Sequence, residues 1–191
     1  MQRAAPYLIP ALWLAWVCYW RIMSSDAKPT VRLESAWSRA AHLVPLFLAA
    51  ALLLMGTVPH GGLLFHRFVA RGWIVYWVGV ALVAAGLGFA VWARVHLGRN
   101  WSASVTVKQG HELVRTGPYA LVRHPIYTGL LLALLGSALA RGQWRGLLAV
   151  LLALAGIWYK LTLEERWMRE TFGAAYDEYR HHSRALIPYL L

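Results

Sequence analysis

The chain has 191 residues, of which 59% are hydrophobic and 14% are charged, whereas soluble domains have about 45–50% apolar and about 25% charged residues. The net charge is +11, but the lysines and arginines stand between long apolar runs, where such residues orient membrane proteins and contact anionic lipid headgroups. The composition therefore argues against a soluble domain and against nucleic acid as a partner.

Four apolar runs follow one another along the chain. A helix needs about 20 apolar residues to cross the hydrocarbon core of a bilayer, and the first three runs are long enough. The fourth is broken at Arg141-Gly142-Gln143, which predicts two shorter helices, roughly 126–140 and 144–160, that form a helical hairpin. We therefore expect an all-α, polytopic membrane protein with about five transmembrane helices. The first three runs cover residues 6–23, 40–58 and 73–95.

The distribution of positive charge predicts an orientation. The loops 21–39 and 94–123 and the tail from Lys160 onward hold four, five and five of the 19 lysines and arginines. Because cytoplasmic loops carry the excess of these residues, the N-terminus is expected outside and the C-terminus in the cytoplasm. We treat residues 1–191 as one membrane domain, in which residues 1–95 form a three-helix scaffold and residues 96–191 carry the chemistry.

The segment 101–127 is too rich in turns and polar residues for a plain connector. Residues 102–107 are β-like, and turn signals follow at 108–110 and 116–118. Arg123-His124-Pro125 then opens a helix, since proline is favoured at the first helical position. Such a helix start is expected to present free N–H groups that can receive an anion, although Arg123 and His124 could equally contact lipid headgroups.

The segment from Lys160 to Tyr179 carries carboxylates at the end of the last apolar run. Lys160 and Glu164 are four residues apart and share one helix face, where they form either part of a site or an ordinary surface pair. Gly173 is expected to end this helix, and residues 174–181 are expected to form a short amphipathic helix. The tyrosines of both segments are either site residues or interfacial anchors: Tyr119, Tyr127, Tyr176 and Tyr179.

Other polar residues suggest no further chemistry. The single cysteine, Cys18, lies in an apolar run and cannot form an intramolecular disulfide. His181 and His182 are adjacent and diverge on a helix, so we predict no metal site. We assign no function to the loop or interfacial histidines His42, His60, His66 and His96.

The two polar segments together carry an extended motif. HELVRTGPY begins at His111 and RHPIY at Arg123; Glu164-Glu165, Phe172-Gly173, Tyr176, Tyr179 and Pro188 follow. This combination strongly resembles the signature of the isoprenylcysteine carboxyl methyltransferase family, which belongs to a superfamily of membrane methyltransferases that also includes phospholipid methyltransferases. The resemblance covers about residues 94–191.

The resemblance implies a membrane methyltransferase that uses S-adenosylmethionine and releases S-adenosylhomocysteine. Catalytic positions implied by it are Lys160, Arg123 and Glu165; an arginine implicated in substrate binding in eukaryotic relatives falls where this chain has Lys160, and lysine lacks the bidentate guanidinium fork. The implied cofactor-binding residues are Ser104, His111, Leu113, Val114, Tyr119, His124, Pro125, Tyr127 and Glu164.

The partners implied by the resemblance are membrane lipids and a lipophilic or prenylated acceptor. The favoured acceptor is the carboxylate of an isoprenylated cysteine, with a phospholipid amine or a small thiol as alternatives. Two readings from other classes remain: an NADPH-dependent reductase, and a membrane protein without enzymatic activity.

Overall fold

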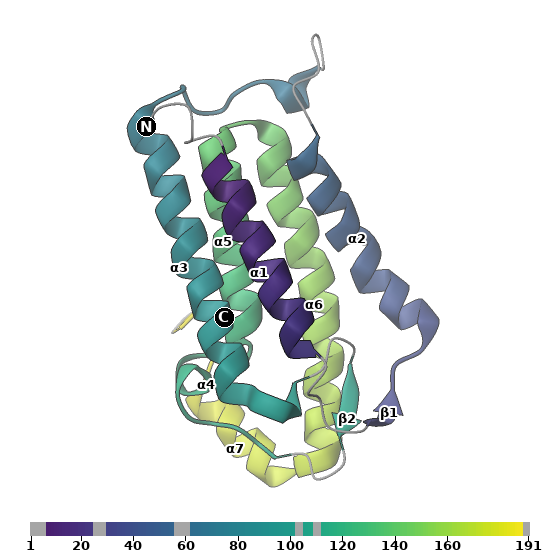
Figure 1. Ribbon diagram of the computed structural model, residues 1–191. Coiled ribbons are helices and arrows are strands. Elements are labelled where there is room, and N and C mark those ends of the chain that lie inside the picture. The colour runs from purple at the N-terminus through teal and green to yellow at the C-terminus, as the bar shows by residue number, and fades with distance from the viewer. Residues whose placement is uncertain (1–6, 25–29, 56–61, 102–104, 109–111, 189–191) are drawn as a thin grey trace.

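Five long helices run alongside one another and form the body of the protein (Figure 1). The computed structural model describes residues 7–24, 30–55, 62–101, 105–108 and 112–188. The long helices are α1 (Leu8–Met23), α2 (Ala36–Leu54), α3 (Trp73–Leu97), α5 (Pro125–Arg141) and α6 (Trp144–Phe172).

The smaller elements gather mostly at one end of the bundle, the lower end in Figure 1. Helices α4 (Pro118–Leu121) and α7 (Ala174–His182) lie there, and so do the strands β1 (Thr30–Leu33) and β2 (Thr106–Lys108). Two short 3-10 helices complete the described elements: η3 (Leu63–Phe65) and η4 (Gly98–Asn100).

Three of the five long helices described have the length and composition of membrane spans, whereas α1, from the first apolar run that the sequence marked as long enough, is shorter than expected. α2, α3 and α6 are each long and apolar enough to cross a bilayer, while α1 and α5 are shorter apolar helices of 16 and 17 residues. The prediction of an all-α, polytopic membrane protein is therefore confirmed.

The expected hairpin is formed by α5 and α6, but its second helix is longer than predicted. Gly142 has a φ of 66° and closes the turn between the two helices. α6 then continues to Phe172, instead of ending near residue 160, because residues 157–172 contain neither glycine nor proline and the first break is Gly173, whose φ is 52°. This continuity places Lys160, Glu164 and Glu165 on the same rigid helix as the apolar span.

A seam of small residues brings α3 and α5 into backbone contact. A Cβ added to Gly79 would lie 2.7 Å from the carbonyl oxygen of Gly136, and a Cβ added to Gly86 would overlap the carbonyl oxygen of Gly129. Small residues allow such close packing in membrane helix pairs. The seam fixes the position at which α5 begins, and therefore the position of His124.

The two strands form an antiparallel ribbon that the sequence predicted only in part. Thr30, Arg32 and Leu33 pair with Lys108, Val107 and Thr106. Of the β-like segment predicted at 102–107, residues 102–104 lie outside the described residues and Thr106 and Val107 fall in β2, whereas the partner strand beside α2 was not expected. The ribbon connects the start of α2 to the segment that precedes α4.

Substitution in the α3–α5 seam gives a direct test of this packing. Gly86→Ala should destabilise the protein by about 1–3 kcal/mol, because the added methyl group overpacks the interface. Gly88→Ala in the same helix is the matched control, since its Cβ would meet nothing within 4 Å. Thermal unfolding in detergent should show a lower Tm for Gly86→Ala only; equal Tm values for the two variants would contradict the seam.

Candidate functional site

A cavity of about 460 Å³ lies at the end of the bundle where α4 and α7 are located. Side chains from all five long helices line it, together with some residues of the segment 112–127 and two tyrosines of α7. Of the twelve predicted site residues, nine line this cavity: Leu113, Val114, Tyr119, Arg123, His124, Pro125, Tyr127, Lys160 and Glu164. Ser104 and His111 lie outside the described residues, and Glu165 is near the cavity but not among the residues that line it.

Glu164 of α6 is the carboxylate that faces the cavity. Its Oε1 accepts a hydrogen bond of 2.7 Å from the Tyr127 hydroxyl and lies 3.9 Å from the Lys160 ammonium. Its Oε2 lies 3.5 Å from Nδ1 of His124. The Lys160 nitrogen also lies 5.5 Å from the centre of the Tyr127 ring. Three other predicted residues therefore meet around the Glu164 carboxylate.

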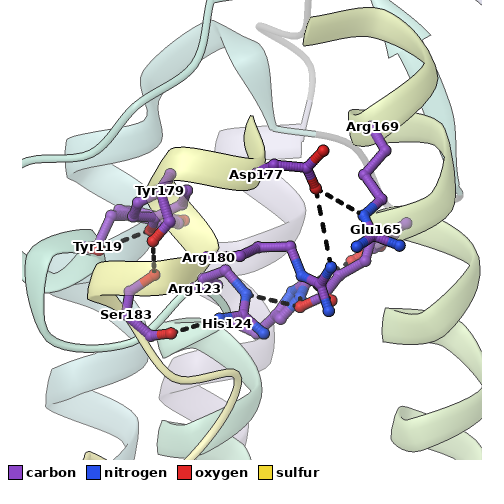
Figure 2. Close-up of polar contacts among 10 residues, drawn as sticks. Tyr119, Arg123, His124, Glu165, Arg169, Asp177, Tyr179, Arg180 and Ser183 are labelled. Carbon is purple, nitrogen blue, oxygen red and sulfur yellow. Dashed lines mark hydrogen bonds and ion pairs between the residues drawn. The ribbon is translucent and has the colours of Figure 1, made fainter. Parts of the chain in front are cut away.

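Glu165 points to the other side of α6 and forms a second cluster (Figure 2). The Arg123 Nε donates a hydrogen bond of 2.7 Å to its Oε1, and Arg180 Nε lies 3.3 Å from its Oε2. His124 Nε2 lies 3.3 Å from Oε1. The His124 imidazole thus lies between the two glutamates and joins the two clusters.

The protonation of His124 follows from these neighbours. Burial alone would lower the pKa of His124, but the hydrogen bonds and negative charges of Glu164 and Glu165 outweigh burial and raise this pKa above its usual value. His124 is therefore biased toward the imidazolium form, in which both ring nitrogens are donors and can serve the two carboxylates at once.

The start of α5 is not as open as the sequence suggested. The backbone N–H groups of Arg123 and His124 donate to the carbonyl oxygens of Arg184 and Ala185, at 2.7 and 3.0 Å. The Arg123 guanidinium also donates to the carbonyl oxygen of Ser183, at 2.5 Å. The expectation that this helix start presents its donors freely to an anion is therefore corrected for Arg123 and for the N–H of His124, because the C-terminal segment 183–185 occupies them.

Two tyrosines of α7, Tyr176 and Tyr179, line the cavity. Tyr179 donates a hydrogen bond of 2.6 Å to the carbonyl oxygen of Tyr119, and Ser183 donates one of 2.6 Å to the carbonyl oxygen of Tyr179 (Figure 2). Tyr176 and Tyr179 are buried. Burial raises the pKa of Tyr179 to about 12, so its hydroxyl remains a donor. The alternative that these two residues are interfacial anchors is not supported.

The apolar wall of the cavity contains residues that sequence reasoning did not select. It is built from the facing sides of α1, α2, α5 and α6. Trp16 and Trp20 stack with their ring centres 4.5 Å apart, and Trp20 meets Trp101 edge to face at 5.6 Å. In the sequence, an apolar residue that faces a cavity looks the same as one that faces lipid. The principal residues of this wall are Trp16, Trp20, Leu43, Leu46, Leu130 and Ile157.

The arrangement joins a charged end to an apolar chamber. The charged end offers the Glu164 carboxylate, the Lys160 ammonium and the His124 imidazole. The apolar chamber can enclose aromatic and aliphatic groups. Such a cavity suits ligands that combine ionic groups with large apolar parts. No group of three or more potential metal ligands occurs in the described part of the chain.

Comparison with known proteins matches residues 74–175, more than half of the chain, to the phospholipid methyltransferase family. The chain is also 29% identical over 121 residues to a probable protein-S-isoprenylcysteine O-methyltransferase of Oryza sativa subsp. indica, an alignment that covers 62% of this chain. It spans 63% of the length of that rice protein, which is less than two thirds.

Two further relatives share part of their sequence with the chain, and one of them carries a different name. The chain is 34% identical over 99 residues to the protein-S-isoprenylcysteine O-methyltransferase of Schizosaccharomyces pombe, covering 50% of this chain and 42% of that protein. It is 31% identical over 121 residues to a cobalt-zinc-cadmium resistance protein of Cupriavidus metallidurans, covering 62% and 54%. The matched region contains α3, α5, α6 and most of the charged residues of the cavity. The chain therefore belongs to the phospholipid methyltransferase family of membrane proteins and is related to the protein-S-isoprenylcysteine O-methyltransferases.

Proposed function

We propose that the protein is an S-adenosylmethionine-dependent methyltransferase that methylates a lipophilic acceptor, specifically the carboxylate of an isoprenylated cysteine. One observation carries the proposal: a single cavity joins the Lys160–Glu164–His124 cluster to an apolar wall formed by the membrane helices. An acceptor with an ionic head and a long apolar tail fits both ends of such a cavity.

The described residues fit the cofactor. S-adenosylmethionine supplies a methyl group on a positively charged sulfur, and it also carries an ammonium group, a carboxylate, a ribose and an adenine. The Glu164 carboxylate can pair with a cationic group or with the ribose hydroxyls, and the charged His124 can pair with the carboxylate. Tyr119, Val114 and Leu113 line the same cavity and can enclose the adenine.

Lys160 would hold the acceptor. A lysine ammonium attracts a carboxylate as a point charge, without the bidentate geometry of arginine. Because an ionised carboxylate needs no base before it attacks, the residues around it need only align it and exclude water. The apolar wall from Trp16 to Ile157 would supply that exclusion and hold the lipophilic tail.

The resemblance implied catalytic roles for Arg123 and Glu165, but their contacts suit these residues better to holding other residues of the site in place. Arg123 Nε and Nη1 donate to Glu165 and to the Ser183 carbonyl oxygen, and Glu165 also faces His124 and Arg180. We propose that they fix His124 rather than contact the acceptor. By the distribution of lysine and arginine, this end of the bundle would lie on the cytoplasmic side.

Cofactor binding should depend on the cavity carboxylate and the imidazole. Glu164→Gln and His124→Gln should each weaken S-adenosylmethionine binding about tenfold or more, because each removes a charged hydrogen-bonding group. Glu170→Gln is the control, since Glu170 lies on the same helix but in an exposed pair with Arg32. Isothermal titration calorimetry in detergent would measure the affinities. Normal binding by both site variants would refute the assignment, and binding of NADPH instead would refute the function.

Acceptor and orientation can be tested together in vesicles. Methyl-labelled S-adenosylmethionine and a prenylcysteine acceptor should give a labelled methyl ester in inverted vesicles, in which the cytoplasmic side is exposed. Sealed right-side-out vesicles should give no label, because the charged cofactor does not cross the bilayer. Phospholipid and thiol acceptors serve as comparisons; label in either, without label in prenylcysteine, would replace the proposed acceptor with the alternative one.

The raised pKa of His124 predicts how stability varies with pH. A group whose pKa is raised in the folded state contributes stability that is fully present below about pH 6.5 and is lost as pH rises through the folded-state value. The Tm of the wild type should therefore fall more steeply than that of His124→Gln above pH 6.5. His182→Gln, at an exposed histidine, should follow the wild type. Parallel curves for the wild type and His124→Gln would contradict the charged imidazole.

A further inference from the structure

Four arginines gather at the end of the bundle opposite the cavity, where the segment 62–72 crosses the turn between α5 and α6 (Figure 1). The backbone of this segment is bonded to the turn. The N–H of Phe68 donates to the carbonyl oxygen of Gly142 at 3.0 Å, and that of Trp144 donates to the carbonyl oxygen of His66 at 3.2 Å. The arginines come from both sides of this junction and are called the arginine cluster: Arg67, Arg71, Arg141 and Arg145.

The hydrogen bonds of the cluster bring its guanidinium groups toward one another. Arg67 donates to the carbonyl oxygens of Val69, at 3.1 Å, and of Arg141, at 2.8 Å. Arg141 and Arg145 both donate to the carbonyl oxygen of Met55, at 3.2 and 2.7 Å. Each of these acceptors is a neutral oxygen. Two positive groups therefore meet at one carbonyl oxygen, although like charges repel.

The sequence around the cluster contains no acidic side chain. Residues 35–111 and 113–163, which hold all four arginines, include no aspartate or glutamate. The acidic side chains that the structure describes belong to the other end: Glu112 lines the cavity, and the rest lie next to β1, near the end of α6 or on α7. The cluster therefore forms a positive surface that is complementary to an anion.

The length of α6 places the cluster at a membrane–water boundary. Arg145 and Glu164 are 19 residues apart on this helix, which corresponds to about 29 Å. The hydrocarbon core of a bilayer is about 30 Å thick, so Arg145 lies at one boundary when Glu164 lies at the other. Trp73 and Trp144 adjoin the cluster and are 56% and 45% exposed, and exposed tryptophans are typical of the level of the lipid headgroups.

Arg71 and Arg141 are the members of the cluster that can reach a ligand. The Arg71 side chain is exposed, and its charge contributes, after burial, to a lowered pKa of Arg67. Arg141 is partly exposed, and within the described residues it uses one of the five N–H donors of its guanidinium. Arg145 is fully buried, with its guanidinium 4.8 Å from the centre of the Phe65 ring, so it contributes charge but no contact.

We propose that the arginine cluster binds the headgroup phosphate of an anionic phospholipid, which Arg71 and Arg141 contact and to which Arg67 and Arg145 add attraction. Arginine is suited to phosphate because its planar fork can donate two parallel hydrogen bonds. The exposed tryptophans beside the cluster can contact the acyl chains, which a free phosphate lacks. A zwitterionic headgroup fits less well, since its ammonium would lie among arginines. The bound lipid would fix the depth of the α5–α6 hairpin in the bilayer.

The lipid preference can be measured on the full-length protein in an uncharged detergent. Native mass spectrometry would compare the binding of phosphatidylglycerol with that of phosphatidylcholine carrying the same acyl chains. The wild type should bind phosphatidylglycerol about fivefold more tightly or better, because each arginine near a membrane surface contributes a factor of about five to the attraction of anionic lipid. Equal binding of the two lipids would overturn the proposal.

Single substitutions assign the binding to the cluster. Arg71→Gln and Arg141→Gln should each weaken the binding of phosphatidylglycerol about fivefold and leave that of phosphatidylcholine unchanged. Arg166→Gln is the matched control, because it removes one charge from an exposed side chain near the opposite end of α6, and its binding should stay within about twofold of the wild type. An equal loss in Arg166→Gln would show that net charge alone attracts the lipid and would overturn the proposal. If Arg141→Gln folds poorly, Arg71→Gln decides, since Arg71 is exposed.

Inorganic phosphate distinguishes a lipid from a free anion. A ligand that binds the folded protein raises its Tm in proportion to the occupancy of the site. Phosphatidylglycerol should therefore raise the Tm of the wild type, whereas inorganic phosphate at the same concentration should not. An equal rise with both would indicate a site for a free anion and would overturn the lipid. None of these measurements requires methyltransferase activity, so their outcome is independent of the proposed function.

Discussion

The polar end of the cavity is organised around His124, whose two ring nitrogens face the carboxylates of Glu164 and Glu165. Adjacent residues on a helix project about 100° apart, so two successive glutamates cannot serve one ligand from the same direction. One therefore faces the cavity and the other faces α7 and Arg123. The His124 imidazole interacts with both carboxylates, and the two carboxylates in turn stabilise the positive charge of the imidazole. Removing either glutamate would leave both His124 and the start of α5 less firmly held.

The position of this imidazole is set by packing far from it. The glycine seam between α3 and α5 fixes the height of α5, and the Gly156–His42 contact fixes α6 against α2. The two glutamates lie on α6 and His124 directly precedes α5, and each of these two helices is packed closely against a different neighbour. These backbone contacts tolerate little displacement, so they fix the distances between the charged groups. A more loosely packed bundle would not maintain those distances.

The sequence predicted much of this arrangement, for reasons that can be identified. Apolar runs and breakers located the long helices, and the motif residues from Leu113 to Glu164 converge on one cavity. The pairing of β1 with β2 was missed because a four-residue strand beside a helix start leaves little pattern. The burial of His42 was missed for a related reason: periodicity in an almost wholly apolar helix does not distinguish the face toward protein from the face toward lipid. The occupied amides of Arg123 and His124 could not be foreseen either, since their partners are some sixty residues away.

The contacts of residues 183–186 with the start of α5 also bear on how the protein is made. Arg184, Ala185 and Leu186 accept hydrogen bonds from Arg123, His124 and Thr128, which precede them by about sixty positions. These bonds can form only after α6 and α7 have been synthesised. The charged end of the cavity can therefore be completed only after all the long helices have been synthesised.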